Sequence, residues 1–165
     1  MMTFRNATLN DLPKIVEIYN STIASRMVTA DTDPVSVESR QKWFEEHNHD
    51  KRPLLVMEDD QKKIIGWMSF KSFYGRPAYN GTAEISIYLD PAARGKGVGK
   101  KALTYAMEKT QSLGIQTLLG FIFAHNEPSL RLFRGAGFTD WALLPDIANL
   151  DGVERSLVIL GKRIN

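Results

Sequence analysis

The segment 84–101 constrains the fold more than any other part of this chain, because it combines a strand, a glycine-rich turn and a helix start. Apolar residues alternate with polar ones from Ala83 to Leu89, which is the period-2 pattern of a half-buried strand. Pro91 ends that strand, and the turn that follows reads Arg94-Gly95-Lys96-Gly97-Val98-Gly99-Lys100. Apolar residues then recur at helical spacing. The sequence therefore predicts free backbone N–H groups and basic side chains at a helix N-terminus, where a pyrophosphate binds.

The spacing of the glycines narrows the choice of phosphate ligand. A P-loop would need a glycine at Arg94 and a hydroxyl at Lys101, and the dinucleotide fingerprint would need a glycine at Lys100. What remains is R-x-x-G-x-G at Arg94, Gly97 and Gly99, which resembles the acetyl-CoA pyrophosphate loop of the GNAT N-acetyltransferase superfamily. The resemblance implies acetyl-CoA as co-substrate, contacted along the whole turn. The alternative is a strand-to-helix turn with a solvated basic rim.

A second signature lies further along the chain. Residues 117–123 predict a buried strand, and the chain then reads Asn126-Glu127-Pro128-Ser129-Leu130-Arg131-Leu132-Phe133-Arg134-Gly135-Ala136-Gly137-Phe138. Asn126 is a good N-cap, Gly137 suits the end of that helix, and Gly114 suits the end of the preceding one. This run resembles the second GNAT signature, in which an Asn and a small residue three places on contact the CoA arm. The resemblance implies those roles for Asn126 and Ser129, with Phe133 beside them.

A third pattern points to one branch of that superfamily. The run from Arg76 to Glu84 reads R-x-A-Y-x-x-T-x-E, which resembles the phosphinothricin acetyltransferase-like, or L-amino acid N-acetyltransferase, branch. The N-terminal run Phe4-Arg5-x-Ala7-Thr8 is similar to that branch as well. The likeness covers essentially the whole chain. It implies acetyl transfer to the amine of a small molecule, such as an amino acid or an analogue like phosphinothricin.

Pattern alone predicts a mixed α/β domain spanning residues 1–165. The expected strands cover residues 2–7, 54–57, 64–70, 83–89 and 117–123, with two more flanking Asp151-Gly152, a strong hairpin dipeptide. Helices are expected after Thr8, from Ser36 to Glu46, after the glycine-rich turn and after the second signature. The GNAT resemblance implies one central mixed, mostly antiparallel sheet of about seven strands flanked by helices, an α/β layer architecture. It also implies acetyl-CoA in the splay between the fourth and fifth strands.

Composition sets limits on other functions. The net charge is only +2, so no nucleic-acid partner is implied. The chain has no cysteine, which excludes disulfides and thiolate chemistry. No segment approaches a membrane-spanning length, and the N-terminus lacks an apolar signal core, so a cytoplasmic location without membrane contact is expected. The run His47-Asn48-His49-Asp50 is interpreted as an exposed helix end and not as a metal site, and no metal is expected.

Acetyl transfer to an amine needs a docked donor, a neutral amine and a polarised thioester. The family resemblance implies that backbone groups of Ile87, Tyr88 and Leu89 pair with the pantetheine arm and polarise the carbonyl. It implies that Glu84 takes the proton of the ammonium group, and burial would raise the pKa of this carboxyl toward a useful value. Glu84 could instead hold the ammonium by charge, or face solvent as an ordinary strand residue.

Three further side chains are candidates for binding the substrate. Arg76 could clamp a carboxylate through its guanidinium, or point to solvent. Tyr79 could form a wall of the pocket or pack within its loop. Ser86 lies on the same strand face as Glu84.

Phe133 departs from the family pattern. Many GNAT enzymes have a Tyr there, and relatives in this branch often have a His, which is proposed to protonate the leaving thiolate. Phe133 cannot do so, and Tyr88 and His125 are the candidate substitutes; an unassisted thiolate is also a tolerable leaving group. Acetylation of a protein N-terminus or a polyamine, a non-catalytic CoA-binding module, and a homodimer all remain open.

Overall fold

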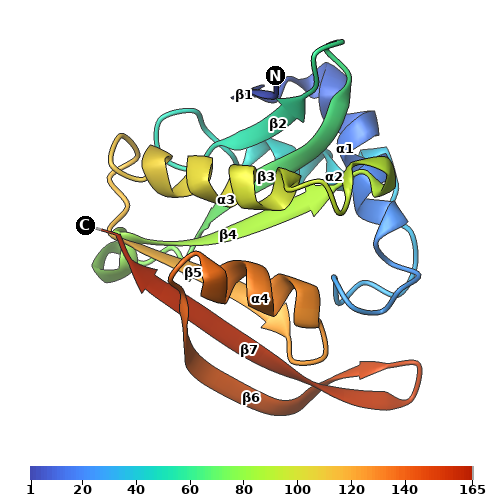
Figure 1. The fold of residues 1–165 in the computed structure, drawn as a ribbon, viewed down its shortest axis with the longest axis vertical. Coiled ribbons are helices and arrows are strands. Elements are labelled where there is room, and N and C mark those ends of the chain that lie inside the picture. The colour runs from blue at the N-terminus through green and yellow to red at the C-terminus, as the bar shows by residue number, and fades with distance from the viewer. Residues whose placement is uncertain (165) are drawn as a thin grey trace.

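The computed structural model describes residues 1–164, which form one seven-stranded sheet with helices on both faces (Figure 1). The strands are β1 (Thr3–Asn6), β2 (Leu54–Glu58), β3 (Ile64–Ser72), β4 (Thr82–Leu89), β5 (Thr117–Phe123), β6 (Thr139–Leu150) and β7 (Val153–Arg163). They pair in the order β1-β2-β3-β4-β5-β7-β6, and within residues 1–164 only the β4–β5 pair is parallel. The expected mixed, mostly antiparallel sheet is confirmed.

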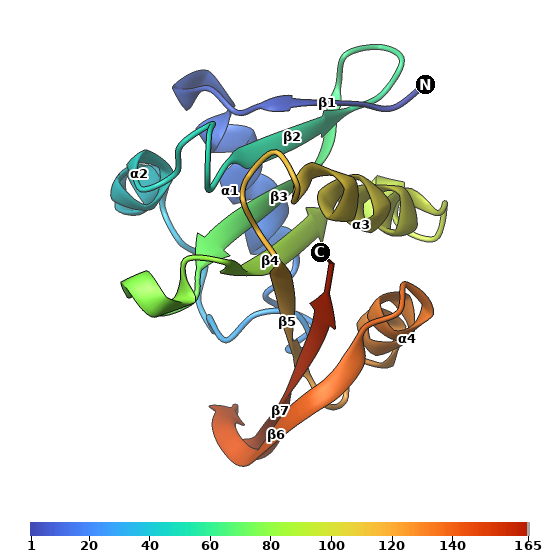
Figure 2. The same cartoon turned by 90° about the vertical axis from the view of Figure 1, so that its left-hand side faces the viewer.

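The helices are α1 (Leu12–Ser21), α2 (Val37–Glu45), α3 (Val98–Lys109) and α4 (Glu127–Gly135). Short 3₁₀ turns cover Leu9–Asp11, Pro77–Tyr79 and Pro91–Ala93. Figure 2 shows α1 and α2 on one face of the sheet and α3 and α4 on the other. Each pair covers its own apolar cluster: α1 packs on β2 and β3 around Trp67, and α3 and α4 pack on the opposite face around Phe70 and Phe133. The expected order of strands and helices is therefore confirmed.

One helix ends earlier than the sequence predicted. Gly114 is not the C-cap of α3, because that helix ends at Lys109 and Thr110 caps it, with its backbone N–H donating to the Met107 carbonyl. The Thr110 hydroxyl donates to the same carbonyl at 2.6 Å. Gly114, with φ of +69°, instead serves the turn that leads into β5.

The predicted hairpin at Asp151-Gly152 is confirmed. The two residues connect β6 and β7, and both have positive φ, +56° for Asp151 and +84° for Gly152. Two central residues with positive φ define the type I′ turn, whose twist matches that of the flanking strands.

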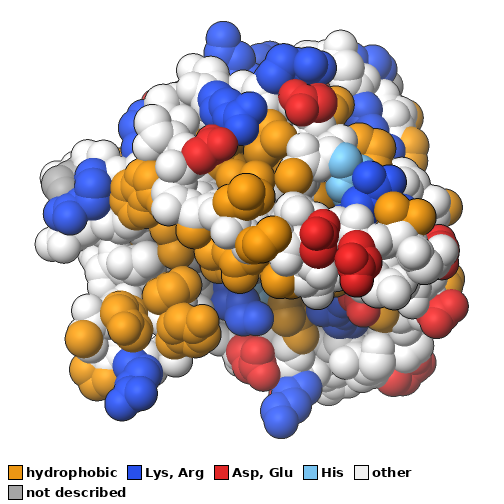
Figure 3. Space-filling model, turned by 90° about the horizontal axis from the view of Figure 1, so that it is seen from below, with side chains coloured by type: hydrophobic (Ala, Val, Ile, Leu, Met, Phe, Trp, Pro, Cys, Tyr) orange, Lys and Arg blue, Asp and Glu red, His pale blue; other side chains and the backbone are white. Residues whose placement is uncertain are grey.

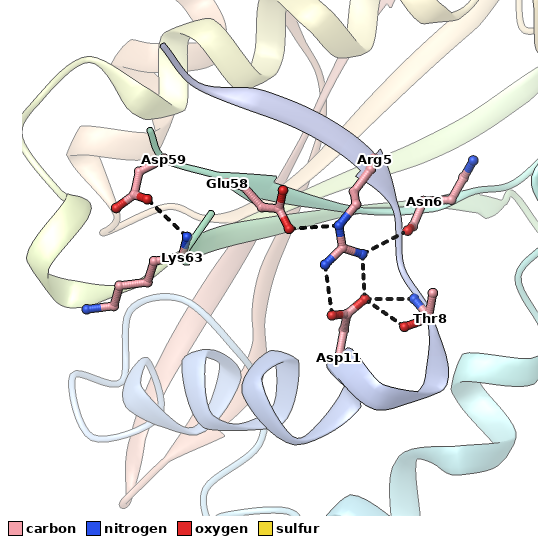
Figure 4. A network of polar contacts seen from close by, with 7 residues as sticks. All are labelled: Arg5, Asn6, Thr8, Asp11, Glu58, Asp59 and Lys63. Atoms are coloured by element: carbon pink, nitrogen blue, oxygen red, sulfur yellow. Dashed lines mark hydrogen bonds and ion pairs between the residues drawn. The ribbon is translucent and has the colours of Figure 1, made fainter. Parts of the chain in front are cut away.

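The N-terminal run has a structural role. The Arg5 guanidinium donates to both carboxylate oxygens of Asp11, at 2.7 and 3.0 Å, and to Glu58 at 2.8 Å (Figure 4). Asp11 also accepts from the Thr8 backbone N–H at 2.8 Å. The bond from Arg5 is the main reason that the pKa of Asp11 is lowered. This network ties β1 to β2 and to the turn that starts α1.

The central strands separate part of the way along their length. β4 and β5 pair only at Thr82↔Thr117, Ala83↔Leu118 and Glu84↔Leu119. Beyond these pairs, β4 continues to Leu89 and β5 to Phe123 without a register between them. The far half of β4 therefore has no strand partner on its β5 side, and the candidate site forms where the two strands diverge.

Candidate active site

A cavity of about 510 Å³ lies beside β4, within the range typical of small-molecule sites. It is called the acceptor cavity here. Its lining residues are Trp43, Glu46, His47, Arg52, Phe70, Lys71, Ser72, Phe73, Tyr74, Gly75, Glu84 and Phe121. Aromatic walls with a few charged groups suit a small, polar ligand that has an apolar side chain.

Glu84 is the predicted catalytic residue in this cavity. It is half-buried, and Lys71 is its direct cross-strand neighbour on β3. Burial raises the pKa of the Glu84 carboxyl, and the positive charge of Lys71 partly opposes this rise. A carboxylate with a raised pKa is a better proton acceptor than an ordinary surface Glu, because its basicity moves toward neutral pH.

His47 also lines the acceptor cavity, and the sequence interpretation missed it. The expected exposed helix end is wrong for this residue, which is half-buried and packs edge-on against Trp43 at 4.9 Å. Its Nδ1 lies 3.0 Å from the Trp43 carbonyl and its Nε2 lies 3.1 Å from the Ser69 hydroxyl. Burial lowers the pKa of His47, so the ring favours its neutral form. No pattern in the sequence signals this, because the Ser69 contact spans two separate elements.

A second cavity of about 60 Å³ occupies the splay between β4 and β5, and is called the splay cavity here. It is lined by Val28, Ile85, Ser86, Ile87, Tyr88, Phe121, Ile122, Asn126, Ser129 and Phe133. The structure thus brings together five predicted cofactor residues from two separate motifs. Phe121 lines both cavities, so they adjoin at this ring. Ser86, predicted to bind the acceptor, lines the splay cavity instead.

The side chain of Asn126 is engaged within the protein. Its Oδ1 accepts from the Ser129 backbone N–H at 3.3 Å, which caps α4 as predicted. Its Nδ2 donates to the Met27 carbonyl at 3.2 Å. The residue is buried and fixes the end of β5 against the loop that contains Val28.

The glycine-rich turn is exposed at the N-terminus of α3. Gly95 and Gly97 have φ of +73° and +77°, a conformation that only glycine adopts without strain. Gly99 differs from the prediction, because it lies inside α3, where an added Cβ would sit 3.3 Å from Leu132 of α4. It permits close helix packing and does not shape the turn. The Arg94 guanidinium donates to the Leu89 carbonyl at 3.3 Å, which links the turn to the end of β4.

Arg76 and Tyr79 do not line the acceptor cavity. They lie in and beside the Pro77–Tyr79 turn, are exposed, and line a neighbouring depression together with Tyr74, which borders both. The structure therefore separates Arg76 from Glu84, which the sequence motif had suggested would act together.

Phe133 is buried and packs edge-on against Phe138 at 5.0 Å. Of the two substitutes considered for its missing proton, only Tyr88 lines the splay cavity. Tyr88 stacks on Trp67 at 4.5 Å, and burial raises the pKa of its phenol, which keeps the proton on at neutral pH. His125 does not line that cavity; its Nε2 lies 2.8 Å from the Arg26 carbonyl.

Within residues 1–164, no group of three or more His, Asp or Glu side chains is arranged to hold a metal ion. No helix in the same range is long and apolar enough to cross a membrane.

Comparison with known proteins indicates the family of this chain. The family described as Acetyltransferase (GNAT) domain matches residues 2–139. The chain is 54% identical to "Putative phosphinothricin acetyltransferase YwnH" of Bacillus subtilis, over 99% of this chain and 100% of that protein. It is 29% identical to an L-methionine sulfoximine/L-methionine sulfone acetyltransferase of Pseudomonas aeruginosa, over 91% of this chain and 87% of that one.

A solved structure has the same fold. The crystal structure of a GNAT superfamily phosphinothricin acetyltransferase from Sinorhizobium meliloti, in complex with acetyl-CoA, superposes with a TM-score of 0.91 at 28% identity. The match covers 98% of this chain and 88% of that chain. Together with the match over residues 2–139, this likeness places the protein in the GNAT acetyltransferase family.

Proposed function

We propose that this protein is an acetyl-CoA-dependent N-acetyltransferase that acts on the amine of a free amino acid or amino-acid analogue. The observation that carries the proposal is the meeting of the two cavities at Phe121, next to Glu84. A thioester in the splay and an amine beside Glu84 would then be in contact. The acetyl-CoA complex of the Sinorhizobium meliloti relative and the names of the amino-acid-directed relatives support this assignment.

The reaction follows from the placement of the groups. The amine nitrogen attacks the acetyl carbon, the new C–N bond forms, and the C–S bond breaks. Glu84 accepts the proton that the ammonium must lose, directly or through a water. The backbone groups of residues 85–89 that β5 leaves unpaired pair with the pantetheine arm and polarise the thioester carbonyl. Residues 94–100 and the N-terminus of α3 bind the pyrophosphate.

The departing thiolate must either receive a proton from another group or leave as the anion, because Phe133 has no acidic proton to donate. Tyr88 borders the splay cavity with its phenol protonated, and is the candidate donor. A thiolate that leaves unprotonated is the alternative, because the pKa of a thiol is only about 8.5.

Turnover of acetyl-CoA with a panel of amines tests the proposal. L-methionine sulfone and phosphinothricin are expected to be acetylated with a higher kcat/KM than spermidine or a peptide with a free N-terminus. A polyamine is disfavoured because Arg52 and Lys71 balance Glu46 and Glu84 in the acceptor cavity, which therefore lacks the excess of carboxylates that would attract a polycation. Preference for the peptide or spermidine would refute the substrate class. Binding of acetyl-CoA with no turnover of any amine would leave a CoA-binding module.

A homodimer is proposed as well. Large apolar side chains stand exposed on the β6–β7 hairpin, with Leu143 63% and Ile147 56% exposed, near Trp141 and Val153. Figure 3 shows hydrophobic side chains gathered on the face of the molecule seen from below Figure 1, the end where this hairpin lies. Contiguous exposed apolar surface is typical of protein contacts. Sedimentation equilibrium should give twice the monomer mass, and Leu143→Glu should restore the monomer; a wild-type monomer would refute the dimer.

A further inference from the structure

The guanidinium of Arg52 lies in the wall of the acceptor cavity, just ahead of β2. Its Nε donates to the Ser72 hydroxyl at 3.0 Å, and its two Nη atoms donate to the carbonyls of Lys51 and Asn80, each at 2.8 Å. One acceptor is the preceding residue, and the other two come from the end of β3 and from the turn before β4. They hold the planar group in one orientation before any ligand arrives.

Arg52 has no charged partner among the described residues 1–164. Its three acceptors are neutral, and within residues 1–164 no carboxylate oxygen lies within 4.0 Å of its guanidinium nitrogens. By contrast, Arg5, Arg26 and Arg134 each form an ion pair with an Asp. A guanidinium has five N–H bonds, so two of those on Arg52 have no acceptor in the described chain.

Burial of Arg52 destabilises its charged form, and a negatively charged ligand could offset this loss of hydration. The side chain is half-buried, and burial lowers its pKa, because the charged form loses hydration without gaining a counter-ion. Arg76 differs, since it is exposed and water already solvates its charge. A ligand carboxylate would therefore gain more at the fixed, partly dry guanidinium of Arg52.

Arg52 and Glu84 line the same cavity. Ser72, which Arg52 contacts, is the register partner of Ala83, the residue next to Glu84. Arg52 and Glu84 border this cavity, Arg52 in contact with Ser72 at the end of β3 and Glu84 opposite Lys71 of the same strand. An α-amino acid with one charge-assisted hydrogen bond at each end spans about 9 Å. Arg52 precedes β2 and Glu84 lies on β4, two strand spacings of about 4.8 Å apart across β3, so a ligand of that length can reach both.

We propose that Arg52 binds the carboxylate of the substrate while Glu84 binds its amine, so that the acceptor cavity selects free α-amino acids over the same compounds without a carboxylate. This inference rests on the proposed function and assigns to Arg52 the role that the sequence motif suggested for Arg76. Lys71, on the same wall, is exposed and sits opposite Glu84, where it acts on that carboxyl.

The test compares L-methionine sulfone with its carboxamide, which has the same side chain and amine but no negative charge. The readout is the ratio of kcat/KM for the acid to kcat/KM for the amide. In the wild type the acid should be preferred, and Arg52→Gln should reduce this ratio about 10- to 100-fold, chiefly through KM for the acid. Arg52→Lys should retain part of the preference, since it keeps the charge without the planar fork. Lys51→Gln is the matched control, because it removes an exposed charge from the adjacent position.

The outcomes separate the two proposals. A fall in the ratio for Arg52→Gln but not for Lys51→Gln supports the inference, provided that affinity for acetyl-CoA and the unfolding temperature stay close to those of the wild type. An unchanged ratio in Arg52→Gln, or a collapse in Arg76→Gln instead, overturns the inference while the proposed function stands. Wild-type protein that acetylates neither the acid nor the amide overturns the proposed function, and the inference with it.

Discussion

Gly120 on β5 faces the ring of Phe133, a residue that lines the splay cavity. A substitution at Gly120 therefore tests how tightly this wall of the cavity is packed. A Cβ added at Gly120 would sit 2.6 Å from Cε2 and 2.9 Å from Cδ2 of Phe133. Real Cβ atoms do not approach so closely, so the ring would have to move. It cannot move freely, because Phe133 is buried and packs edge-on against Phe138 at 5.0 Å.

Gly120→Ala should therefore destabilise the fold by about 1–3 kcal/mol, the usual cost of adding a carbon to a packed core. For 165 residues this corresponds to a fall in Tm of about 2–12 °C. Because Phe133 lines the splay cavity, its displacement should also raise KM for acetyl-CoA. Urea unfolding and steady-state kinetics measure the two effects.

Two further variants test whether Gly120 and Phe133 are in tight contact. Phe133→Leu added to Gly120→Ala should recover stability, with a favourable coupling of about 0.5–3 kcal/mol, because the smaller side chain leaves room for the new Cβ. Gly135→Ala is the control, since nothing lies within 4 Å of the Cβ that it adds at the end of α4. Unchanged stability in Gly120→Ala, or simple additivity in the double variant, would show that the two residues are not in tight contact.

Four other outcomes are expected. Glu84→Gln should lower kcat/KM strongly yet leave Tm unchanged or higher at neutral pH. The raised pKa of Glu84 means that the folded protein disfavours the charged carboxyl, which the amide replaces. A loss of affinity for acetyl-CoA would contradict the assignment of Glu84 to the acceptor side. Lys71→Met should move the acid limb of the kcat/KM profile to higher pH, since activity needs ionised Glu84 and Lys71 lowers its pKa; an unmoved limb would count against Glu84 as the base. Gly97→Asp should weaken acetyl-CoA binding more than Gly97→Asn, which tolerates the same positive φ without the charge, and calorimetry with both variants checks it. Tyr88→Phe should lower kcat by about 100-fold or more if the phenol protonates the thiolate, and an unchanged kcat would show that the thiolate leaves unassisted.

Local chemistry allowed much of the fold to be predicted. The positive φ angles at Gly95, Gly97 and the Asp151-Gly152 turn follow from which residues tolerate that conformation. The strand from Thr117 to Phe123 and the cap at Asn126 follow from hydrophobic period and capping preference. Such signals lie within a few neighbouring residues, so the sequence displays them directly.

The end of α3 shows the limit of such signals. Gly114 has the residue type and the positive φ of a helix terminus, yet Thr110 ends the helix earlier by bonding to Met107. Gly99 likewise looks like part of the turn, but faces Leu132 across a helix–helix contact. A glycine in the sequence does not reveal whether it serves backbone conformation or close packing, because only the second depends on a partner from elsewhere.

Within the site, the sequence determined the parts that one segment carries, and the tertiary structure decided the rest. Glu84 and the glycine-rich turn belong to a single strand–turn–helix unit, so the turn could be proposed from the spacing of its glycines and Glu84 from the resemblance to the GNAT family; both roles stay predictions. Arg52 and His47 could be placed in the site only from the structure, because β3, the segment before β2 and the loop after α2 come together around one cavity. Arg76 lies eight positions from Glu84 in the chain, yet it borders a different depression. The physical reason is that burial, counter-ions and cavity walls are set by contacts between distant segments, and no local pattern encodes those contacts.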